Sequence, residues 1–376
     1  MFNNTAEVAQ KSAVRALPLD DVHRRSGATM TEREGWALPE NYEDAGAEYN
    51  TVRNGGAGVI DLSARGRILV SGSEAVTFLN GLITNDVKTL AKNSWMPAAF
   101  PTVQGRLLAS VRVINRGDDF LIDTESATHE IVLKLLDRFT LAGDFRIADM
   151  TESMVMVSLQ GNTAEQVLRA TLDAPTLEVE RQQMVTATFA NTELTLIRAT
   201  HTAEDGFDLF VAAETAENLW TGLVESGAIP IGFAALEILR IEAGLPLYGL
   251  DMDETNVVTE TNLDDAVSFT KGCYVGQEII ARIKYRGHVA KKLTGLILEQ
   301  QTVLAASASI YSSDDKEIGR VTSSAFSPHL GRTVALGYVK YDYLAPWTSV
   351  KVAAGESKVS ANVAELPLVR GSWYGG

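Results

Sequence analysis

The sequence predicts an α+β fold that ends in a small all-β barrel or sandwich, and three observations support this fold class. Up to about residue 289, segments with apolar residues at helical spacing alternate with short apolar runs typical of strands. After Leu293 the helical spacing disappears, and short β-prone runs alternate with turns of Gly, Ser, Asp and Pro. The 376 residues, 45% of them hydrophobic, are enough for two or three domains with full-sized cores. We expect a flexible tail over residues 1–16, an α+β region over 17–289 and a β-barrel over 290–376.

The individual elements follow from local spacing and from residues typical of turns and helix ends. Segments 58–62 and 67–70 are predicted to form a hairpin with Gly66 at its bend. Gly287, just past the last predicted helix, suits a left-handed cap. Helices are predicted over residues 20–25, 74–82, 131–139, 164–172, 213–226, 233–244 and 277–285. Further strands are predicted over residues 95–100, 107–114, 120–123, 154–159, 194–199 and 207–211, and in the barrel over 293–298, 308–311, 319–323, 334–339, 349–352 and 359–363.

The charge balance and the single cysteine restrict the kind of protein. The chain has 33 basic and 48 acidic residues, a net charge of −15, which argues against general binding of nucleic acids or anionic membranes. It contains no apolar run near the 18 or so residues that a membrane span needs, and its first twenty residues lack a signal-peptide core. One cysteine excludes an internal disulfide and fits a reducing compartment. We therefore expect a cytoplasmic protein.

Basic residues nevertheless gather in one segment. Residues 271–292 carry six bases against the single acid Glu278, whereas residues 251–265 carry six acids and no base. This segment is either a solvated helix face or a docking site for a small polyanion, such as the glutamyl tail of folate. The six bases are Lys271, Arg282, Lys284, Arg286, Lys291 and Lys292.

The stretch Lys271–Glu278, KGCYVGQE, contains the only cysteine of the chain. Cys273 precedes the predicted helix 277–285 and lies two residues from Lys271. A helix N-terminus and a nearby cation both favour thiolate over thiol, so the sequence predicts a thiol of raised nucleophilicity. The alternative is that Cys273 is a small buried apolar residue, as many free cysteines are.

KGCYVGQE resembles the signature of the YgfZ family, the folate-binding relatives of the glycine-cleavage T protein that support iron–sulfur cluster proteins. Similar stretches of aminomethyltransferases typically have an acid where Cys273 stands and a base where Gln277 stands. The resemblance implies tetrahydrofolate as cofactor and iron–sulfur client or assembly proteins as partners, with Cys273 as the reactive thiol and Lys271 beside it. It also implies that Tyr274, Gln277 and Arg282 help to bind folate. One cysteine cannot hold a four-thiolate cluster within one chain.

Two further strings extend the resemblance. Thr202–Asp208, TAEDGFD, is by itself a strand, an Asp-Gly turn and a strand with solvated carboxylates. A similar string of the T-protein family places a glutamate against the pterin, which implies that role for Glu204, because a carboxylate can accept two hydrogen bonds from the amino-pyrimidine edge. The string that begins at Arg240, RIEAGLP, implies that Arg240 lies near the folate site; the alternative is a salt bridge with Glu242 or a neighbouring helix.

One string departs from the aminomethyltransferases. These enzymes carry an adjacent aspartate pair a few residues after a glycine-containing turn, and the matching positions here are Ala109 and Ser110. Neither residue can act as a carboxylate base, so the departure argues against glycine-cleavage aminomethyltransferase activity. The resemblance otherwise covers residues 17–369 and implies three lobes, with two interleaved α+β lobes, a C-terminal β-barrel, and folate bound where the lobes meet.

The resemblance implies a tetrahydrofolate-binding protein that supports iron–sulfur cluster assembly or repair. A folate-dependent one-carbon (aminomethyl) transferase or demethylase, and a non-catalytic adaptor, are the alternatives. No metal site is expected, because the five histidines show no ligand spacing, and His201 is expected to lie on the surface.

Overall fold

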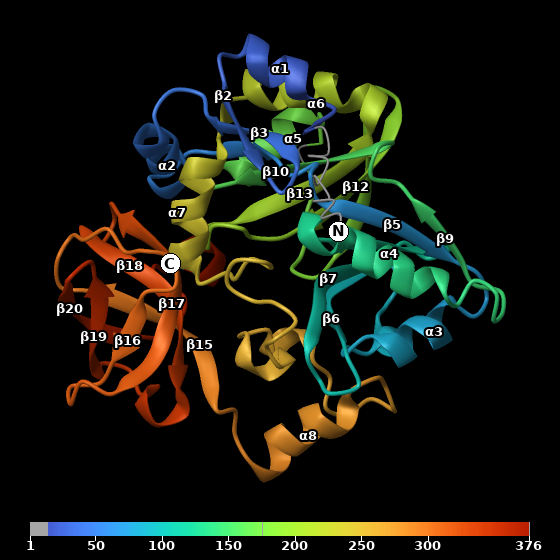
Figure 1. Ribbon diagram of the computed structural model, residues 1–376. Coiled ribbons are helices and arrows are strands. Elements are labelled where there is room, and N and C mark those ends of the chain that lie inside the picture. The colour runs from blue at the N-terminus through green and yellow to red at the C-terminus, as the bar shows by residue number, and fades with distance from the viewer. Residues whose placement is uncertain (1–13, 175, 376) are drawn as a thin grey trace, which may run out of the picture.

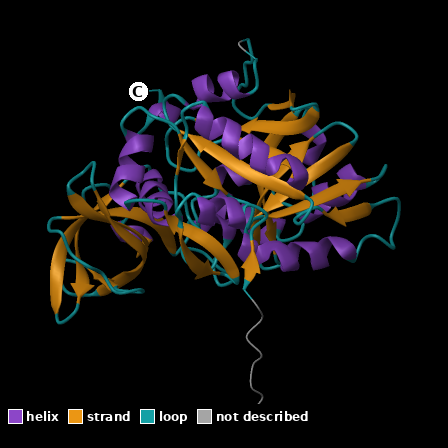
Figure 2. Ribbon diagram, turned by 90° about the horizontal axis from the view of Figure 1, so that it is seen from above, coloured by secondary structure: helices purple, strands orange, loops and turns teal. Residues whose placement is uncertain are grey.

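The computed structural model describes residues 14–174 and 176–375. It contains two larger β-sheets, a small three-stranded sheet and a β-barrel (Figures 1 and 2). Most of the predicted tail 1–16 therefore lies outside the described residues, and Arg15–Ala16 form a short strand, β1. In the small sheet, β1 pairs with β3 (Trp36–Asn41), which also pairs with β2 (Thr29–Arg33). Among the described residues, no helix has the length and apolar character needed to cross a membrane.

The two larger sheets are built from interleaved parts of the chain. The chain enters the six-stranded sheet with β4, leaves it to form the whole five-stranded sheet, and returns with β10. In spatial order, the six-stranded sheet contains β11 (Met184–Phe189), β12 (Thr192–Arg198), β13 (Gly206–Ala212), β10 (Met154–Gln160), β4 (Gly58–Asp61) and β14 (Ile229–Pro230). The five-stranded sheet contains β6 (Ser94–Pro101), β7 (Leu107–Asn115), β8 (Asp119–Thr124), β5 (Gly66–Ser71) and β9 (Arg146–Asp149).

The predicted hairpin over residues 58–70 is wrong. Strand β4 pairs with β10 and β14, whereas β5 pairs with β8 and β9 in the other sheet. All four residues of β4 are buried, as in a strand covered on both faces. A turn residue between two short apolar runs is compatible with a hairpin and also with a chain that crosses from one sheet to another, so this pattern does not distinguish the two.

The helices cover the sheets and agree with the predicted helices within two residues, except for α2, which the sequence did not reveal. Helix α2 has few apolar residues, and Tyr49 and Val52 are those that it buries. Its N-cap Asp44 accepts a hydrogen bond from the Ala47 N–H. The helices are α1 (Asp20–Arg25), α2 (Ala45–Arg53), α3 (Ala75–Leu82), α4 (His129–Asp137), α5 (Ala164–Thr171), α6 (Ala213–Glu225), α7 (Phe233–Ala243) and α8 (Gln277–Arg286).

Left-handed glycines occur at other helix ends than predicted. Helix α7 ends at Gly244, which has a φ of 72°. Gly287, after α8, has a φ of −166° and is extended, so its predicted left-handed cap is wrong. The chain there runs on directly toward the first barrel strand. The left-handed glycine of α8 is Gly276, with a φ of 77°, at the start of that helix.

The C-terminal strands form a closed six-stranded antiparallel barrel, which confirms the predicted fold class. Strand β15 (Lys291–Leu298) pairs with both β18 (Arg332–Lys340) and β20 (Ser357–Ala364), which closes the barrel. Figure 2 shows the barrel beside the two larger sheets. Helix α7 contacts β17 of the barrel and β3 of the three-stranded sheet. The remaining barrel strands are β16 (Ser309–Tyr311), β17 (Glu317–Ser327) and β19 (Ser349–Ala354).

Candidate functional site

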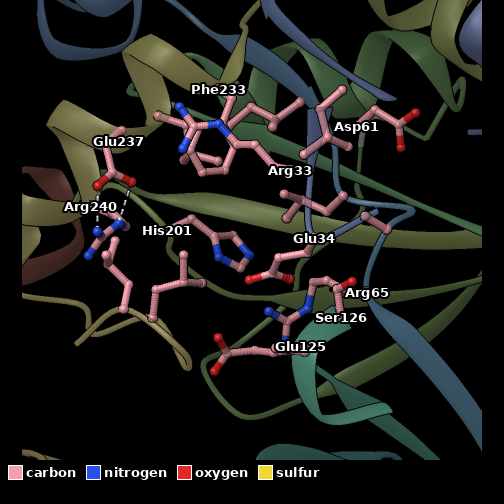
Figure 3. Close-up of a pocket in the computed structure, with 18 of the residues that line it drawn as sticks. Arg33, Glu34, Asp61, Arg65, Glu125, Ser126, His201, Phe233, Glu237 and Arg240 are labelled. Carbon is pink, nitrogen blue, oxygen red and sulfur yellow. Dashed lines mark hydrogen bonds and ion pairs between the residues drawn. The ribbon is translucent and has the colours of Figure 1, made fainter. Parts of the chain in front are cut away.

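A cavity of about 640 Å³ lies between the two interleaved sheets and α7 (Figure 3). Its walls come from the β2–β3 hairpin, the segment that leaves β4, the loop after β8, and α7 with the segment that follows it. Most of this wall is apolar, and a few polar side chains project from it. The apolar lining includes Leu38, Ile60, Leu62, Phe233, Leu236 and Leu247. Ligand-binding pockets typically combine this volume with mainly apolar walls and a few convergent polar groups.

A chain of buried ion pairs supports one wall of the cavity. The Arg65 Nε and Nη2 atoms donate to the two Asp123 carboxylate oxygens, each at 2.8 Å, and the Arg112 Nε donates to Asp123 at 2.7 Å. Arg112 also donates to Asp208, whose carboxylate lies 3.0 Å from the His201 Nε2. Of these residues, Arg65 and His201 line the cavity.

The charges in this chain keep its carboxyl groups ionised. Burial by itself would raise the pKa of Asp123, but the guanidinium groups of Arg112 and Arg65 hold it below its usual range. Burial would likewise raise the pKa of Asp208, but His201 and Arg112 hold it well below its usual range. The contact with the ionised Asp208 carboxylate therefore holds the His201 ring in place, and 20% of the His201 side chain is exposed.

Two other carboxyl groups of the cavity have raised pKa values. Burial raises the pKa of Glu125 to about 7, although the Arg65 charge and the hydrogen bond from the Tyr248 N–H act against this rise. Burial also raises the pKa of Glu34, which is at the tip of the β2–β3 hairpin. Lining groups with perturbed pKa values are more common at functional sites than elsewhere.

Arg240 also lines the cavity, but its guanidinium group is already held by neighbouring side chains. Its Nε donates to Glu237 at 2.7 Å, and its Nη1 donates to Asp251 at 2.7 Å. The salt bridge between Arg240 and Glu242 that was considered from the sequence is not among the ion pairs of the described residues. The Glu242 carboxylate instead accepts hydrogen bonds from Tyr49, Arg53 and Ser327.

Glu204 does not line this cavity. It is 4% exposed, and its carboxylate accepts from the Arg53 Nη1 at 2.6 Å and from the Ser372 N–H and Oγ at 2.8 and 2.7 Å. The C-terminal segment Ser372–Tyr374 therefore packs against the turn that carries Glu204, and the Trp373 N–H donates to the Ala203 carbonyl. In this arrangement, both carboxylate oxygens are used within the protein.

The KGCYVGQE residues also lie outside the cavity lining. Lys271 is buried, and its Nζ donates to the backbone carbonyls of Asn80 in the last turn of α3 and of Ile83 and Asn85 just after this helix. Burial lowers the pKa of this ammonium group to about 8. Cys273 is exposed, so the buried alternative considered for it is wrong. Lys271 thus anchors the loop that carries the thiol.

The other residues assigned to folate binding from this stretch have separate surroundings. Tyr274 is buried in a cluster with Ala99, Leu107 and Tyr248. Gln277 lies at the start of α8 and donates weakly to the Lys271 and Gly272 carbonyls, both at 3.4 Å. Arg282 is exposed on α8. The structure brings Arg240 to the cavity but brings none of Glu204, Lys271, Cys273, Tyr274, Gln277 and Arg282 there.

Several residues of the cavity wall and of the ion-pair chain that supports it were not recognised from the sequence. His201 was expected on the surface, and Arg65, Glu125 and Asp123 were not considered. The available signal was an acid within an otherwise apolar strand, as in DFLIDT for Asp123 and GFDLFVA for Asp208. Such an acid needs a buried partner, but the sequence does not name that partner. Among residues 14–174 and 176–375, no three His, Cys, Asp or Glu side chains gather as metal ligands would.

Two interleaved sheets with an appended barrel define the architecture, and comparison with known proteins gives the family. Residues 19–271 match the GCVT N-terminal domain, and residues 291–370 match the glycine cleavage T-protein C-terminal barrel domain. The chain therefore belongs to the glycine cleavage T-protein family.

Relatives and a solved structure agree with this family over nearly the whole chain. The aminomethyltransferase of Rubrobacter xylanophilus is 33% identical over 363 residues, which are 96% of this chain and 95% of that protein. The probable aminomethyltransferase of Natronomonas pharaonis is 32% identical over 95% of this chain and 99% of its own. The crystal structure of aminomethyltransferase T from Bartonella henselae has the same fold, with a TM-score of 0.88 and 24% identity over 95% of this chain and 99% of that one. These relatives carry aminomethyltransferase names, so the family is established and the YgfZ branch stays a prediction.

Proposed function

We propose that the protein binds tetrahydrofolate in the cavity and is a folate-dependent one-carbon transferase or demethylase. The cavity carries this proposal, because its volume and apolar walls suit the flat pterin and aminobenzoyl rings of a folate. Tetrahydrofolate would supply the nitrogen atoms that carry the one-carbon unit. The family and the aminomethyltransferase names of the relatives support the same reading.

The chain's own residues suggest how a folate would be held. Arg33 projects from the β2–β3 hairpin over the Phe233 ring, and 40% of its side chain is exposed, so we assign it to the glutamyl carboxylates. Arg240 also lines the cavity and would add a second guanidinium group, whose N–H groups already donate to Glu237 and Asp251. The resemblance also keeps Glu204 as a candidate for the pterin edge. Glu204 could accept from a pterin only after Ser372 releases it.

Thermal unfolding with tetrahydrofolate tests this binding site. At a hundredfold excess over its dissociation constant, the ligand should add about 2.7 kcal/mol to the free energy of unfolding. Ala127→Trp, which places a large ring at the cavity wall, should abolish this stabilisation. Ala306→Trp, in an exposed loop of the barrel, is the control and should retain it. Glu204→Gln should retain it if the cavity is the site, and lose it if Glu204 holds the pterin.

The absence of any stabilisation by reduced or oxidised folates would contradict the proposal. A stable complex with a protein partner in that case would support the adaptor instead. Turnover of methylene-tetrahydrofolate in the presence of an amine, unaffected by Cys273→Ala, would support the transferase. Ala109 and Ser110 carry no carboxyl group and neither lines the cavity, so these positions supply no acid or base for that reaction.

Support of iron–sulfur proteins is a second candidate, favoured by the exposed Cys273 on its anchored loop. In that function, the thiol would act across chains or as one transient ligand. In cells that lack this protein, Cys273→Ala should fail to restore the activity of cluster-dependent enzymes while its stabilisation by folate stays unchanged. Restoration by Cys273→Ala to the level of the unchanged protein would exclude this role.

A further inference from the structure

We propose that residues 371–374 form an autoinhibitory latch. In the closed state this latch occupies the Glu204 carboxylate, and it must open before a ligand can bind to that carboxylate. The opening is argued from the contacts that hold these residues. The inference rests on the proposed function in one respect, because a folate is taken as the ligand that competes with the latch.

The latch gives Glu204 the hydrogen bonds that a ligand with two adjacent donors would give. The Ser372 N–H and Oγ both donate to the Glu204 Oε2, at 2.8 and 2.7 Å. The Arg53 Nη1 donates to the other carboxylate oxygen, and the Ser372 Oγ also accepts from the Asp205 N–H at 2.9 Å. Because Glu204 is 4% exposed, opening leaves a buried carboxylate oxygen without its donors. A ligand that supplies replacement donors therefore favours the open state.

The latch approaches Glu204 so closely at position 371 that no side chain fits there. A Cβ added to Gly371 would overlap the Glu204 carboxylate and lie 2.6 Å from the Ala203 carbonyl oxygen. That carbonyl accepts from the Trp373 N–H at 3.1 Å, and Ala203 itself has a φ of 66°, in the left-handed region that alanine rarely adopts. The turn and the latch thus fit each other, and a side chain at position 371 would force the latch open.

The chain just before the latch is firmly held. Val369 is 3% exposed, and the N–H groups of Leu368 and Val369 donate to the Glu242 carbonyl at 2.8 and 3.0 Å. Arg370 follows and is exposed. The fixed end at Val369 and the exposed residue after it make Arg370 the expected hinge of the latch.

The latch itself is held mainly by polar contacts. None of its four residues is buried, and Tyr374 is 44% exposed. The Arg181 guanidinium group lies over the Trp373 ring, 4.4 Å from the ring centre, and Arg181 is exposed as well. Segments with few buried apolar contacts open more readily than the core around them. Opening at Arg370 therefore breaks hydrogen bonds and this cation–π contact without unpacking the barrel.

Hydrogen exchange measured at single amides tests the opening. The Ser372 and Trp373 N–H groups should be protected in the unchanged protein, and Gly371→Val should raise their exchange rates at least tenfold. Ser372→Ala removes the Oγ contacts but keeps the N–H, so it should raise the Trp373 rate less than Gly371→Val does. Gly287→Val is the matched control, because its added Cβ meets no atom within 4 Å on an extended backbone, and it should leave both rates unchanged.

Tetrahydrofolate affinity tests the autoinhibition. Only the open fraction of the protein can bind a ligand that needs the Glu204 carboxylate, so a closed latch weakens the apparent affinity by that fraction. Gly371→Val should therefore bind tetrahydrofolate at least tenfold more tightly than the unchanged protein does. Adding Glu204→Gln to Gly371→Val should remove this gain, and Gly287→Val should bind as the unchanged protein does.

Exchange at Ser372 and Trp373 that is as fast in the unchanged protein as in Gly371→Val would overturn the latch. Faster exchange in Gly371→Val without tighter tetrahydrofolate binding would overturn the autoinhibition and leave the proposed folate function. If neither protein binds tetrahydrofolate, the proposed function fails, and labelling of Glu204 by a water-soluble carbodiimide with glycine ethyl ester decides the latch. Labelling in Gly371→Val but not in the unchanged protein would support the latch, whereas equal labelling would overturn it.

Discussion

Arg53→Met is expected to lower the free energy of unfolding by about 3–5 kcal/mol, the loss typical of removing one partner from a buried charge cluster. The Arg53 side chain is 4% exposed at the end of α2. Its Nη1 lies 2.6 Å from Glu204 and its Nη2 lies 2.7 Å from Glu242, and both carboxylates are buried. Without the guanidinium group, two neighbouring buried anions would lose their shared cation. Urea unfolding, followed to obtain the midpoint and the slope, measures the change.

A control variant and a rescue variant separate the effect of losing the Arg53 charge from the effect of changed packing. Arg25→Met, which breaks the exposed pair of Arg25 with Glu217, should hardly change the midpoint. Adding Glu204→Gln and Glu242→Gln to Arg53→Met should recover part of the lost stability, because neutral amides tolerate burial better than unpaired carboxylates. A midpoint of Arg53→Met equal to that of the unchanged protein would show that this cluster does not hold α2 and α7 together.

Glu125→Gln is expected to have the opposite effect and to stabilise the protein at pH 8. Burial raises the pKa of Glu125 from an ordinary 4.5 to about 7, so folding opposes its ionisation. The unchanged protein should therefore lose stability as the pH rises from about 4.5 through about 7, because the unfolded chain releases this proton first. A shift of this size corresponds to about 3 kcal/mol, which the amide variant should not lose.

Unfolding free energies measured at pH 5, 6, 7 and 8 test this expectation. The difference between Glu125→Gln and the unchanged protein should grow over this range and level off above pH 7. Glu32→Gln should follow the unchanged protein at each pH. Parallel profiles for Glu125→Gln and the unchanged protein would show that Glu125 ionises normally in the folded state.

The local pattern of the sequence predicted most elements but not their partners. Helices α5 and α7 have apolar residues at helical spacing and were located within one or two residues of their observed ends. Helix α2 was missed because the apolar residues that it buries, Tyr49 and Val52, are too few to give a helical pattern in the sequence. The hairpin over residues 58–70 was wrong because strand pairing depends on distant segments, here β8 and β10.

The same limit applies to the site. The string TAEDGFD contains three acids, and the sequence alone does not show where each one points. In the structure, Glu204 turns toward Arg53 and the C-terminal segment, whereas Asp208 reaches His201 beside the cavity. Resemblance directed attention to this string, but strand β13 and its neighbours decide which of its acids is near the cavity.

The sequence by itself determined that this chain is α+β with a C-terminal barrel and has one cysteine and a large acidic excess. Helical and strand periodicity depends on residues a few positions apart, so it can be read locally. Only the tertiary structure decided which charges meet. Arg53 and Glu204 are 151 positions apart, and Arg112 and Asp208 are 96 apart. Such contacts arise from the crossing of the chain between two sheets, which no local pattern records.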